Sequence, residues 1–337
     1  MSFALGAIAA GGAAVIALVA WFGVQSITAE VLQGVWVVPL TALLLCVQLY
    51  LSAAAWRTVV GRRLPGTGGY FRIRWIREAV NSMLPVAQIG GNLVGIRMLT
   101  QRGVPGPLAG AGTTVDLTVE AATQFLFVFA GICTLAAIDL DRASAPWVKA
   151  ALTTMPLALI GFIVAQRVGL LRIIEWLAAR FVRVFPALSI ESVRGLHDEL
   201  MRLHRARLAL AQAAVLHMVA WSLGTVETWL VLAAMGRRTA FSEALVIESL
   251  GMGAARSAGF AVPAALGVQE AGLIVVCGLF GILPETAIAL SMVKRSRDLV
   301  MGLPGLVAWQ WSEGRRLLVR ERGEVYPPRR DLSLPGD

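Results

Sequence analysis

Hydrophobic residues occur in this chain as long runs that are separated by short polar segments. Four runs are almost free of charge: 3–24, 36–56, 147–166 and 209–235. Each is close to the ~20 residues that a helix needs to cross ~30 Å of hydrocarbon. The stretches 106–138 and 286–311 are long enough as well, but they carry charged residues. The pattern therefore predicts an all-α polytopic membrane protein with about six full transmembrane helices.

Two further apolar stretches are interrupted by helix breakers. The first is NSMLPVAQIGGNLVGIRML (81–99), and the second is ARSAGFAVPAALGVQEAGLIVVCGLFGILP (255–284). The breakers are Pro85, Gly90 and Gly91 in the first stretch and Pro263 and Gly267 in the second. A helix over 80–102 reaches ~35 Å, which suffices for one crossing of the bilayer or for two half crossings.

The direction of the chain decides between these two readings. A single crossing at 80–102 would invert every later segment and put the basic segment 167–208 outside, against the positive-inside rule. We therefore predict two re-entrant helical hairpins, and an ordinary kinked helix is the alternative. Non-helical backbone at membrane depth is tolerated only inside protein or beside a water-filled cavity. The hairpins thus indicate a polar pathway.

Composition agrees with a membrane protein. Of the 337 residues, 57% are apolar and 15% are charged, whereas soluble domains carry about 25% charged residues. Cys46, Cys133 and Cys277 lie far apart in apolar stretches, a spacing that fits neither a zinc site nor a disulfide framework. We expect packed core thiols, and neither a metal ion nor a cofactor.

The net charge of +9 comes mostly from arginine. In a soluble protein it would suggest nucleic acid, but these arginines cluster in 57–80, 167–208 and 313–337, between or after the runs. The positive-inside rule places these segments, and both termini, in the cytoplasm; only the loop 236–243 runs against it. We predict one transmembrane domain, 1–312, and a short basic cytoplasmic tail, 313–337.

The segment 167–208 has the amphipathic pattern of a helix that lies in the membrane interface. We predict that its basic residues contact anionic lipid headgroups. Its two histidines, His197 and His204, are expected on a solvated face rather than at a metal.

The two halves, about 57–138 and 236–312, share a register. In each half a polar residue follows the proline of the broken stretch by seven positions: Asn92 after Pro85, and Glu270 after Pro263. The two hairpins are predicted to enter from opposite sides, and a charged span follows each. Inverted repeats with broken helices at corresponding positions indicate a transport site near the middle of the membrane.

Polar side chains at membrane depth are the candidate pathway. A charge at the bilayer centre costs at least ~2.5–3.5 kcal/mol, so such groups must be paired or hydrated. Asp116 and Glu120 share one helix face, and we predict that they meet the basic cluster Lys294, Arg295 and Arg297. An ion-pair network without a functional role is the alternative. The predicted pathway residues are Asn81, Asn92, Arg97, Asp116, Glu120, Glu227, Arg256, Glu270, Lys294, Arg295 and Asp298.

The motifs NSMLPVAQIGGNLVGIRML, TTVDLTVEAATQ, GFAVPAALGVQEAG and VKRSRDLVMGLPGLVAW carry a resemblance. The chain resembles the integral-membrane family typified by the transmembrane part of lysylphosphatidylglycerol synthetase, and within it the hopanoid-biosynthesis-associated proteins of the HpnL type. The resemblance implies a lipid flippase. By motif match it implies that the family's polar positions are Asn81, Arg97, Asp116, Gly267, Glu270 and Arg295.

Two departures from the family's pattern bear on the substrate. Asn92 follows the glycines where a charge is common, and Ala264-Ala265 stand where relatives often carry glycines. The soluble aminoacyl-transferase domain of the lysyltransferases is absent from this sequence, so lysine transfer is not expected.

Three classes of function follow from the sequence. A lipid transporter of flippase type in a bacterial inner membrane is favoured, with anionic phospholipid or hopanoid-type lipid as its partner and lipid-biosynthesis enzymes as further candidates. An intramembrane enzyme is disfavoured because H-E-x-x-H, G-x-S-x-G and nucleotide-loop motifs are absent from the sequence. A non-transporting partner of lipid-modifying enzymes would need no intramembrane charge. Nucleic acid is not expected, and the oligomeric state stays open.

Overall fold

The computed structural model describes residues 16, 20–61, 65–84, 89–138, 190–253 and 267–321, with eight scattered positions between 146 and 161. Predictions for Pro85, Arg256, Pro263 and the tail from 322 onward lie outside these residues. So does most of the predicted span 147–166, together with the amphipathic stretch 167–189.

Every regular element in the described residues is a helix. In chain order they are α2 (Val24–Gly34), the 3₁₀ helix η1 (Val35–Val37), α3 (Val38–Val60), α4 (Thr67–Met83), α5 (Gly90–Thr100), α6 (Gly106–Ile138), α9 (Ile190–Arg205), α10 (Arg207–Ala234), α11 (Phe241–Val246), the π-helix η2 (Ile247–Met252), α13 (Val268–Gly278) and α14 (Pro284–Glu321).

Three of these segments are long and apolar enough to cross a membrane. They are Val24–Val60, Gly106–Ile138 and Arg207–Ala234. α14 is longer still, at 38 residues, but charged residues interrupt its apolar sequence. The chain is therefore an all-α membrane protein, and the number of six full spans stays a prediction.

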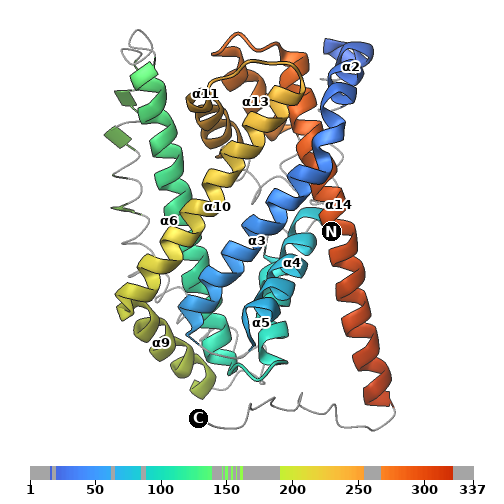
Figure 1. The fold of residues 1–337 in the computed structure, drawn as a ribbon. Coiled ribbons are helices and arrows are strands. Elements are labelled where there is room, and N and C mark those ends of the chain that lie inside the picture. Colours follow the sequence, from blue (N-terminus) through green and yellow to red (C-terminus); the bar gives the residue numbers. More distant parts are fainter. Residues whose placement is uncertain are drawn as a thin grey trace, which may run out of the picture.

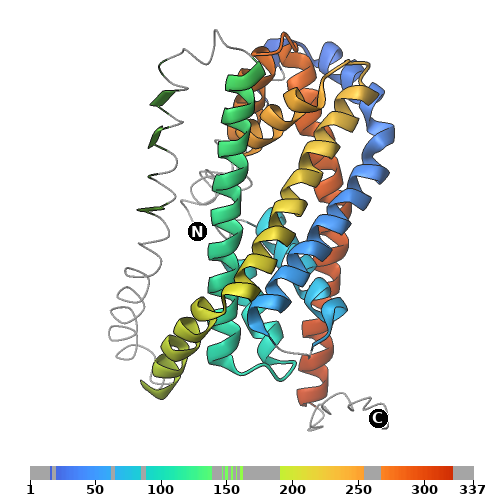
Figure 2. The same cartoon turned by 60° about the vertical axis from the view of Figure 1, so that its left-hand side comes forward.

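Four long helices join the two ends of the molecule (Figure 1). α10 lies between α6 and α3, and α3 and α10 run in opposite directions (Figures 1 and 2). The end of α3, α9 and the end of α14 share the lower end in Figure 1. The end of α6 and the turn after α10 lie at the upper end. The basic segments after α3, at α9 and at the end of α14 thus share one side, as predicted, while its assignment to the cytoplasm stays a prediction.

The first broken stretch forms a helical hairpin of α4 and α5. α4 ends at Met83, and Leu84 is extended (φ −110°, ψ 147°), as expected for a residue that precedes a proline. Most of the segment 57–80, which was predicted to lie in the cytoplasm between two spans, is helical, because α4 begins at Thr67. Arg74 and Arg77 are buried in this helix. The sequence pattern did not reveal α4 as a packed helix, because a hydropathy scale treats every arginine as a side chain that stays in water.

The second pair of helices begins before the broken stretch 255–284. α11 and η2 continue each other and pack against α13, so the stretch predicted to form the whole hairpin supplies only α13 to this pair. α13 has 11 residues, as α5 does. A long helix precedes each pair and another follows it: α3 and α6 around the first pair, α10 and α14 around the second. α6 and α14 run in opposite directions (Figure 1). The hairpin of one half packs on the long helix of the other, α4 on α14 and α11–η2 on α6.

The buried apolar residues of the described chain form two cores. The first is built around Trp56, Tyr70 and Leu99, and Leu200 of α9 is buried in it. The described part of the predicted interfacial segment is therefore packed against the protein as well. The second core surrounds residues such as Leu232 and Leu290.

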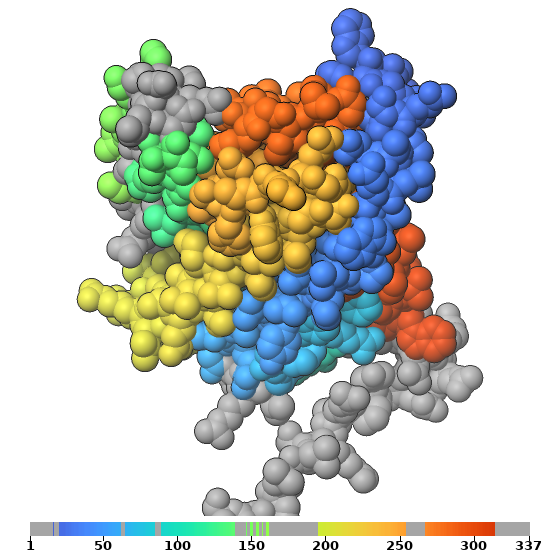
Figure 3. All heavy atoms as spheres, turned by 45° about the horizontal axis from the view of Figure 1, so that its top comes forward, coloured from blue at the N-terminus to red at the C-terminus, as the bar shows by residue number. Residues whose placement is uncertain are grey.

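Apolar side chains also cover the outside of the molecule. Leu43 and Val47 on α3 and Leu303 and Val307 on α14 are between 41% and 66% exposed, which suits contact with lipid tails. Figure 3 shows α10 and α11 at the surface of the upper end, between α6 and α2–α3. Cys133 is exposed too, so the prediction of packed thiols is wrong for this residue, while Cys277 is buried.

Candidate functional site

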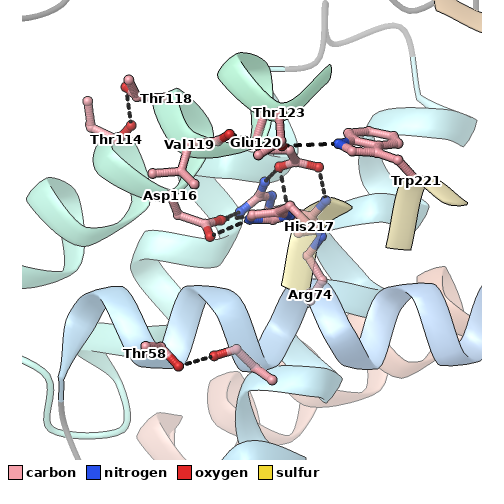
Figure 4. Close-up of polar contacts among 12 residues, drawn as sticks. Thr58, Arg74, Thr114, Asp116, Thr118, Val119, Glu120, Thr123, His217 and Trp221 are labelled. Carbon is pink, nitrogen blue, oxygen red and sulfur yellow. Dashed lines mark hydrogen bonds and ion pairs between the residues drawn. The ribbon is translucent and has the colours of Figure 1, made fainter. Parts of the chain in front are cut away.

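Five ionisable side chains from three helices meet in what we call the lower cluster: Arg74, Arg77, Asp116, Glu120 and His217. Two arginines three residues apart lie on one face of α4, and two carboxylates four residues apart lie on the facing side of α6. α10 adds the imidazole. Figure 4 shows the side chains of Arg74, Asp116, Glu120 and His217 converging.

The contacts within the lower cluster are close. Arg74 binds Glu120 with two hydrogen bonds, of 2.9 Å from Nη1 and 2.5 Å from Nη2. Arg77 Nη2 donates to Glu120 Oε2 at 3.2 Å, and its Nη1 lies 3.5 Å from Asp116 Oδ2. His217 Nε2 is 3.1 Å from Asp116 Oδ1. A carboxylate accepts hydrogen bonds only, so Nε2 carries the proton of this bond.

The lower cluster is buried and balanced. Side-chain exposure is 0% for Asp116, 1% for His217 and 2% for Arg77, and it reaches 16% only at Glu120. Two guanidinium groups face two carboxylates, so the cluster is neutral when the imidazole is neutral. Arg77 also stacks over the ring of Trp56 at 5.2 Å, which stabilises the cation further.

A second group of charges forms the upper cluster: Glu227, Glu248, Lys294, Arg297 and the hydroxyl of Thr228. Lys294 Nζ donates to Glu248 Oε2 at 2.7 Å and lies 3.7 Å from Glu227 Oε2. Thr228 Oγ1 donates to the same Glu248 oxygen at 2.6 Å, and Arg297 Nη1 binds Glu227. All four charged side chains are at most 5% exposed. Two acids and two bases balance here as well.

The two clusters occupy corresponding places in the two halves, with their charges exchanged. Asp116 lies ten residues after the start of α6, and Lys294 lies ten residues after the start of α14. Arg74 lies seven residues after the start of α4, and Glu248 seven after the start of α11. The first hairpin therefore brings the base to an acidic long helix, and the second brings the acid to a basic one.

Helix geometry places the clusters in depth. α6 starts at the lower end and α14 at the upper end (Figure 1). The lower cluster therefore lies ~15 Å along α6 from the lower end, and the upper cluster lies ~15 Å along α14 from the upper end. Along α10, His217 and Glu227 are ten residues apart, which again corresponds to ~15 Å. The clusters therefore flank the middle of the molecule, one on each side.

A third polar contact ties the second hairpin to α14. Glu270 Oε1 accepts hydrogen bonds from Arg295 Nε at 2.8 Å and from Ser291 Oγ at 2.7 Å, while Gln269 donates to the same serine. Glu270 Oε2 accepts from the backbone N–H of Gly267 at 2.8 Å. Gly267 has φ +81°, a conformation that favours glycine, so this predicted breaker shapes the start of α13.

The first hairpin is closed by a different bond. Asn81 Oδ1 accepts from the N–H of Gly91 at 2.9 Å and joins the two helices. A Cβ at Gly91 would collide with the carbonyl of Arg77 and lie 2.5 Å from Asn81 Oδ1. Gly90 is the first residue of α5, and Asn92 lies in its first turn. Asn81 and the glycines are therefore structural contacts of the hairpin.

The predicted pairing of Asp116 and Glu120 with Lys294, Arg295 and Arg297 is wrong. Each acid finds its bases on α4, a hairpin helix of its own half: Arg74 Nη2 lies 2.5 Å from Glu120 Oε1, and Arg77 Nη1 lies 3.5 Å from Asp116 Oδ2.

Two other predicted pathway residues lie outside both clusters. Arg97 is 66% exposed and binds Glu313 at 2.9 Å near the lower end. Asp298 is 38% exposed and lies 3.3 Å from Arg297.

The sequence analysis missed four ionisable members of the clusters and the hydroxyl of Thr228. Arg74 and Arg77 were assigned to a loop, although Ile73 and Ile76 beside them suggested a packed helix. His217 and Glu248 are single polar residues inside apolar sequence, and such isolation was a usable signal. Within the described part of the chain, no group of three or more His, Cys, Asp or Glu side chains is arranged to hold a metal ion.

Comparison with known proteins gives one match. Residues 7–305 match the family described as the lysylphosphatidylglycerol synthase TM region, a range that includes both clusters and both hairpins. No curated protein matches, and no solved structure matches.

Proposed function

The chain belongs to the family of the lysylphosphatidylglycerol synthase TM region, and from this premise we propose that it is a lipid transporter of flippase type. It moves membrane lipids from one leaflet to the other. The family's name refers to an enzyme whose product is a lipid, which supports a lipid as the cargo. Many transporters bind their substrate near the bilayer midplane between two inverted repeats.

The observation that carries the proposal is the pair of buried, balanced charge clusters on either side of the middle. Ionic groups are expensive at membrane depth, and those that persist there often mark substrate pathways. A transporter needs its pathway closed toward one side at a time. The lower cluster joins α4 to α6, and the upper cluster joins η2 to α14, so each can close one end.

The buried polar atoms that lack a hydrogen bond also fit a polar cargo. In the lower cluster they include Arg74 Nε, Arg77 Nε and Arg77 Nη1, and in the upper cluster Glu227 Oε1. Guanidinium groups bind phosphate in the same forked geometry in which they bind carboxylate. A lipid phosphate can thus take the place of Glu120 on the arginines, so that both guanidinium groups stay paired while the lower cluster opens.

The same reasoning extends to substrate, location and partners. We propose an anionic phospholipid as the first substrate to test, because the guanidinium groups of the lower cluster keep buried donors without a hydrogen bond, and a hopanoid-type lipid as the second, because of the sequence resemblance. The chain is proposed to lie in a bacterial inner membrane with α9 and both termini toward the cytoplasm. Lipid-biosynthesis enzymes are the proposed protein partners, and no catalytic step is needed.

The test is transport by the purified chain in proteoliposomes. Fluorescent phosphatidylglycerol, phosphatidylcholine and a hopanoid would be placed in one leaflet, and their appearance in the other followed by chemical quenching. We expect the wild type to move at least one of them faster than protein-free vesicles do. Movement of none would refute the proposal.

A pair of matched variants links transport to the clusters. Glu248→Gln removes one charge from the upper cluster, and Glu313→Gln removes one from the exposed pair with Arg97. We expect Glu248→Gln to slow transport about tenfold or more, since each 1.4 kcal/mol changes a rate tenfold. Glu313→Gln should stay close to wild type. Equal rates for wild type and folded Glu248→Gln would show that the clusters are structural only.

A further inference from the structure

Besides its two acids and two bases, the lower cluster contains a further ionisable group, the imidazole of His217. The chain has three histidines, and the other two lie on α9. His217 is 1% exposed, and its Nε2 lies 3.1 Å from Asp116 Oδ1. In ordinary surroundings, imidazole is the side chain that changes its charge between pH 5 and 8. One of the two clusters thus contains a group suited to take up and release a proton.

The surroundings of His217 determine what a proton would do there. α6 contributes Asp116 and Glu120, and α4 contributes Arg74 and Arg77. α4 also carries the half-buried Glu78, whose negative charge acts on both arginines. α3 also packs against α10, and its charged residue Arg57 donates to the hydroxyl of Thr67. Glu248 of η2 and Lys294 and Arg297 of α14 belong to the upper cluster, ~15 Å away along α10. The four ion-paired charges of the lower cluster cancel, so a proton on His217 adds a charge of +1 to them.

A net buried charge is costly unless a counter-charge accompanies it. The phosphodiester of a lipid such as phosphatidylglycerol carries one negative charge. A zwitterionic headgroup carries none, so it would leave the charge of a protonated imidazole uncompensated. The balance in the lower cluster therefore favours the simultaneous presence of one proton and one monoanionic headgroup.

We propose that His217 takes up a proton when a monoanionic lipid headgroup enters the lower cluster, so that lipid and proton cross the membrane together. This inference rests on the proposed lipid transport and adds its energy source and substrate charge. The proton comes from water on the side where the lipid enters. It binds to Nδ1, because Nε2 donates its own hydrogen to Asp116. It returns to water when the headgroup leaves toward the other side, and no net charge moves.

Coupling of one proton to one lipid has a quantitative consequence. A difference of one pH unit across the membrane corresponds to 1.36 kcal/mol, and it supports about a tenfold ratio of the lipid between the leaflets. A membrane potential should support none, since the transported pair is neutral. A zwitterionic lipid should respond to neither gradient.

The experiment uses the full chain in proteoliposomes that contain pyranine as an internal pH indicator. Labelled phosphatidylglycerol or labelled phosphatidylcholine is supplied under a one-unit pH gradient, under a valinomycin-set potassium potential, or under neither. His217→Gln and His217→Asn are compared with wild type and with His197→Gln, a histidine of α9 outside both clusters. Size-exclusion chromatography verifies that each variant is folded.

We expect the pH gradient alone to drive phosphatidylglycerol toward the alkaline leaflet in wild type and in His197→Gln. The pyranine signal should report one proton entering for each lipid that moves. Both His217 variants should lose this response and keep downhill exchange of the lipid.

Wild-type transport that ignores the pH gradient, or that follows the potential, would overturn the inference and leave the proposed function intact. An unchanged response in a His217 variant would also overturn it. Wild type that moves no lipid under any condition would refute the proposed function itself. If neither His217 variant folds, the responses of wild type to the two gradients decide.

Discussion

Lys294 gives a direct test of the charge pairing in the fold. Its Nζ donates to Glu248 at 2.7 Å and lies 3.7 Å from Glu227, and its side chain is 1% exposed. Lys294→Met keeps much of the apolar stem but leaves two carboxylates facing one guanidinium. The resulting uncompensated buried charge should lower the free energy of unfolding by about 3–5 kcal/mol.

A second substitution shows with which residue Lys294 is paired. Glu248→Gln removes the surplus negative charge and keeps an oxygen that can accept from Thr228. We expect the free energy of unfolding of the double variant to exceed, by about 1–3 kcal/mol, the value obtained by adding the losses of the two single variants. Couplings between membrane helices average about 0.6 kcal/mol, so a larger value identifies a buried charge pair rather than an ordinary hydrogen bond.

The assay is reversible unfolding of the purified variants in mixed detergent micelles, analysed as a double-mutant cycle. The matched control combines Lys294→Met with Asp116→Asn, because Asp116 belongs to the lower cluster. These two effects should add within about 0.5 kcal/mol. Strong coupling of Lys294 to Asp116, with none to Glu248, would refute the arrangement of two separate clusters.

Two further predictions concern the hairpin and the topology. Gly91→Ala should destabilise the protein by at least about 1 kcal/mol in the same unfolding assay, because the new methyl group displaces the hydrogen bond to Asn81. Gly68→Ala, where the added carbon meets nothing within 4 Å, should be neutral or stabilising, and equal losses at the two sites would contradict the hairpin packing. In a background with all three native cysteines replaced, Gly66→Cys and Gly278→Cys should react with an impermeant thiol reagent from opposite sides of the membrane. Gly66→Cys is expected to react from the cytoplasm, and labelling of both from one side would exclude the topology.

Several features of this fold follow from local sequence. The helical segments Val24–Val60, Gly106–Ile138 and Arg207–Ala234 contain or match three runs that were identified by apolarity and length. α4 ends just before Pro85, and α5 begins at Gly90, because helix breakers act on the backbone of their immediate neighbours.

The charges of the candidate site could be predicted only in part. Asp116, Glu120, Glu227 and Lys294 were recognised because each interrupts apolar sequence. Their partners were not identified correctly.

The choice of partners was decided by the tertiary structure. The sequence around Arg74 is as basic as a cytoplasmic loop. Its side chain is nevertheless only 6% exposed, because it forms an ion pair with Glu120, forty-six residues away. His217 reads as one polar residue in a span until α10 is placed against α6. The stability of a charge at membrane depth depends on the group that faces it. A local pattern therefore determines where the chain crosses and breaks, whereas helix packing determines which charges neutralise each other.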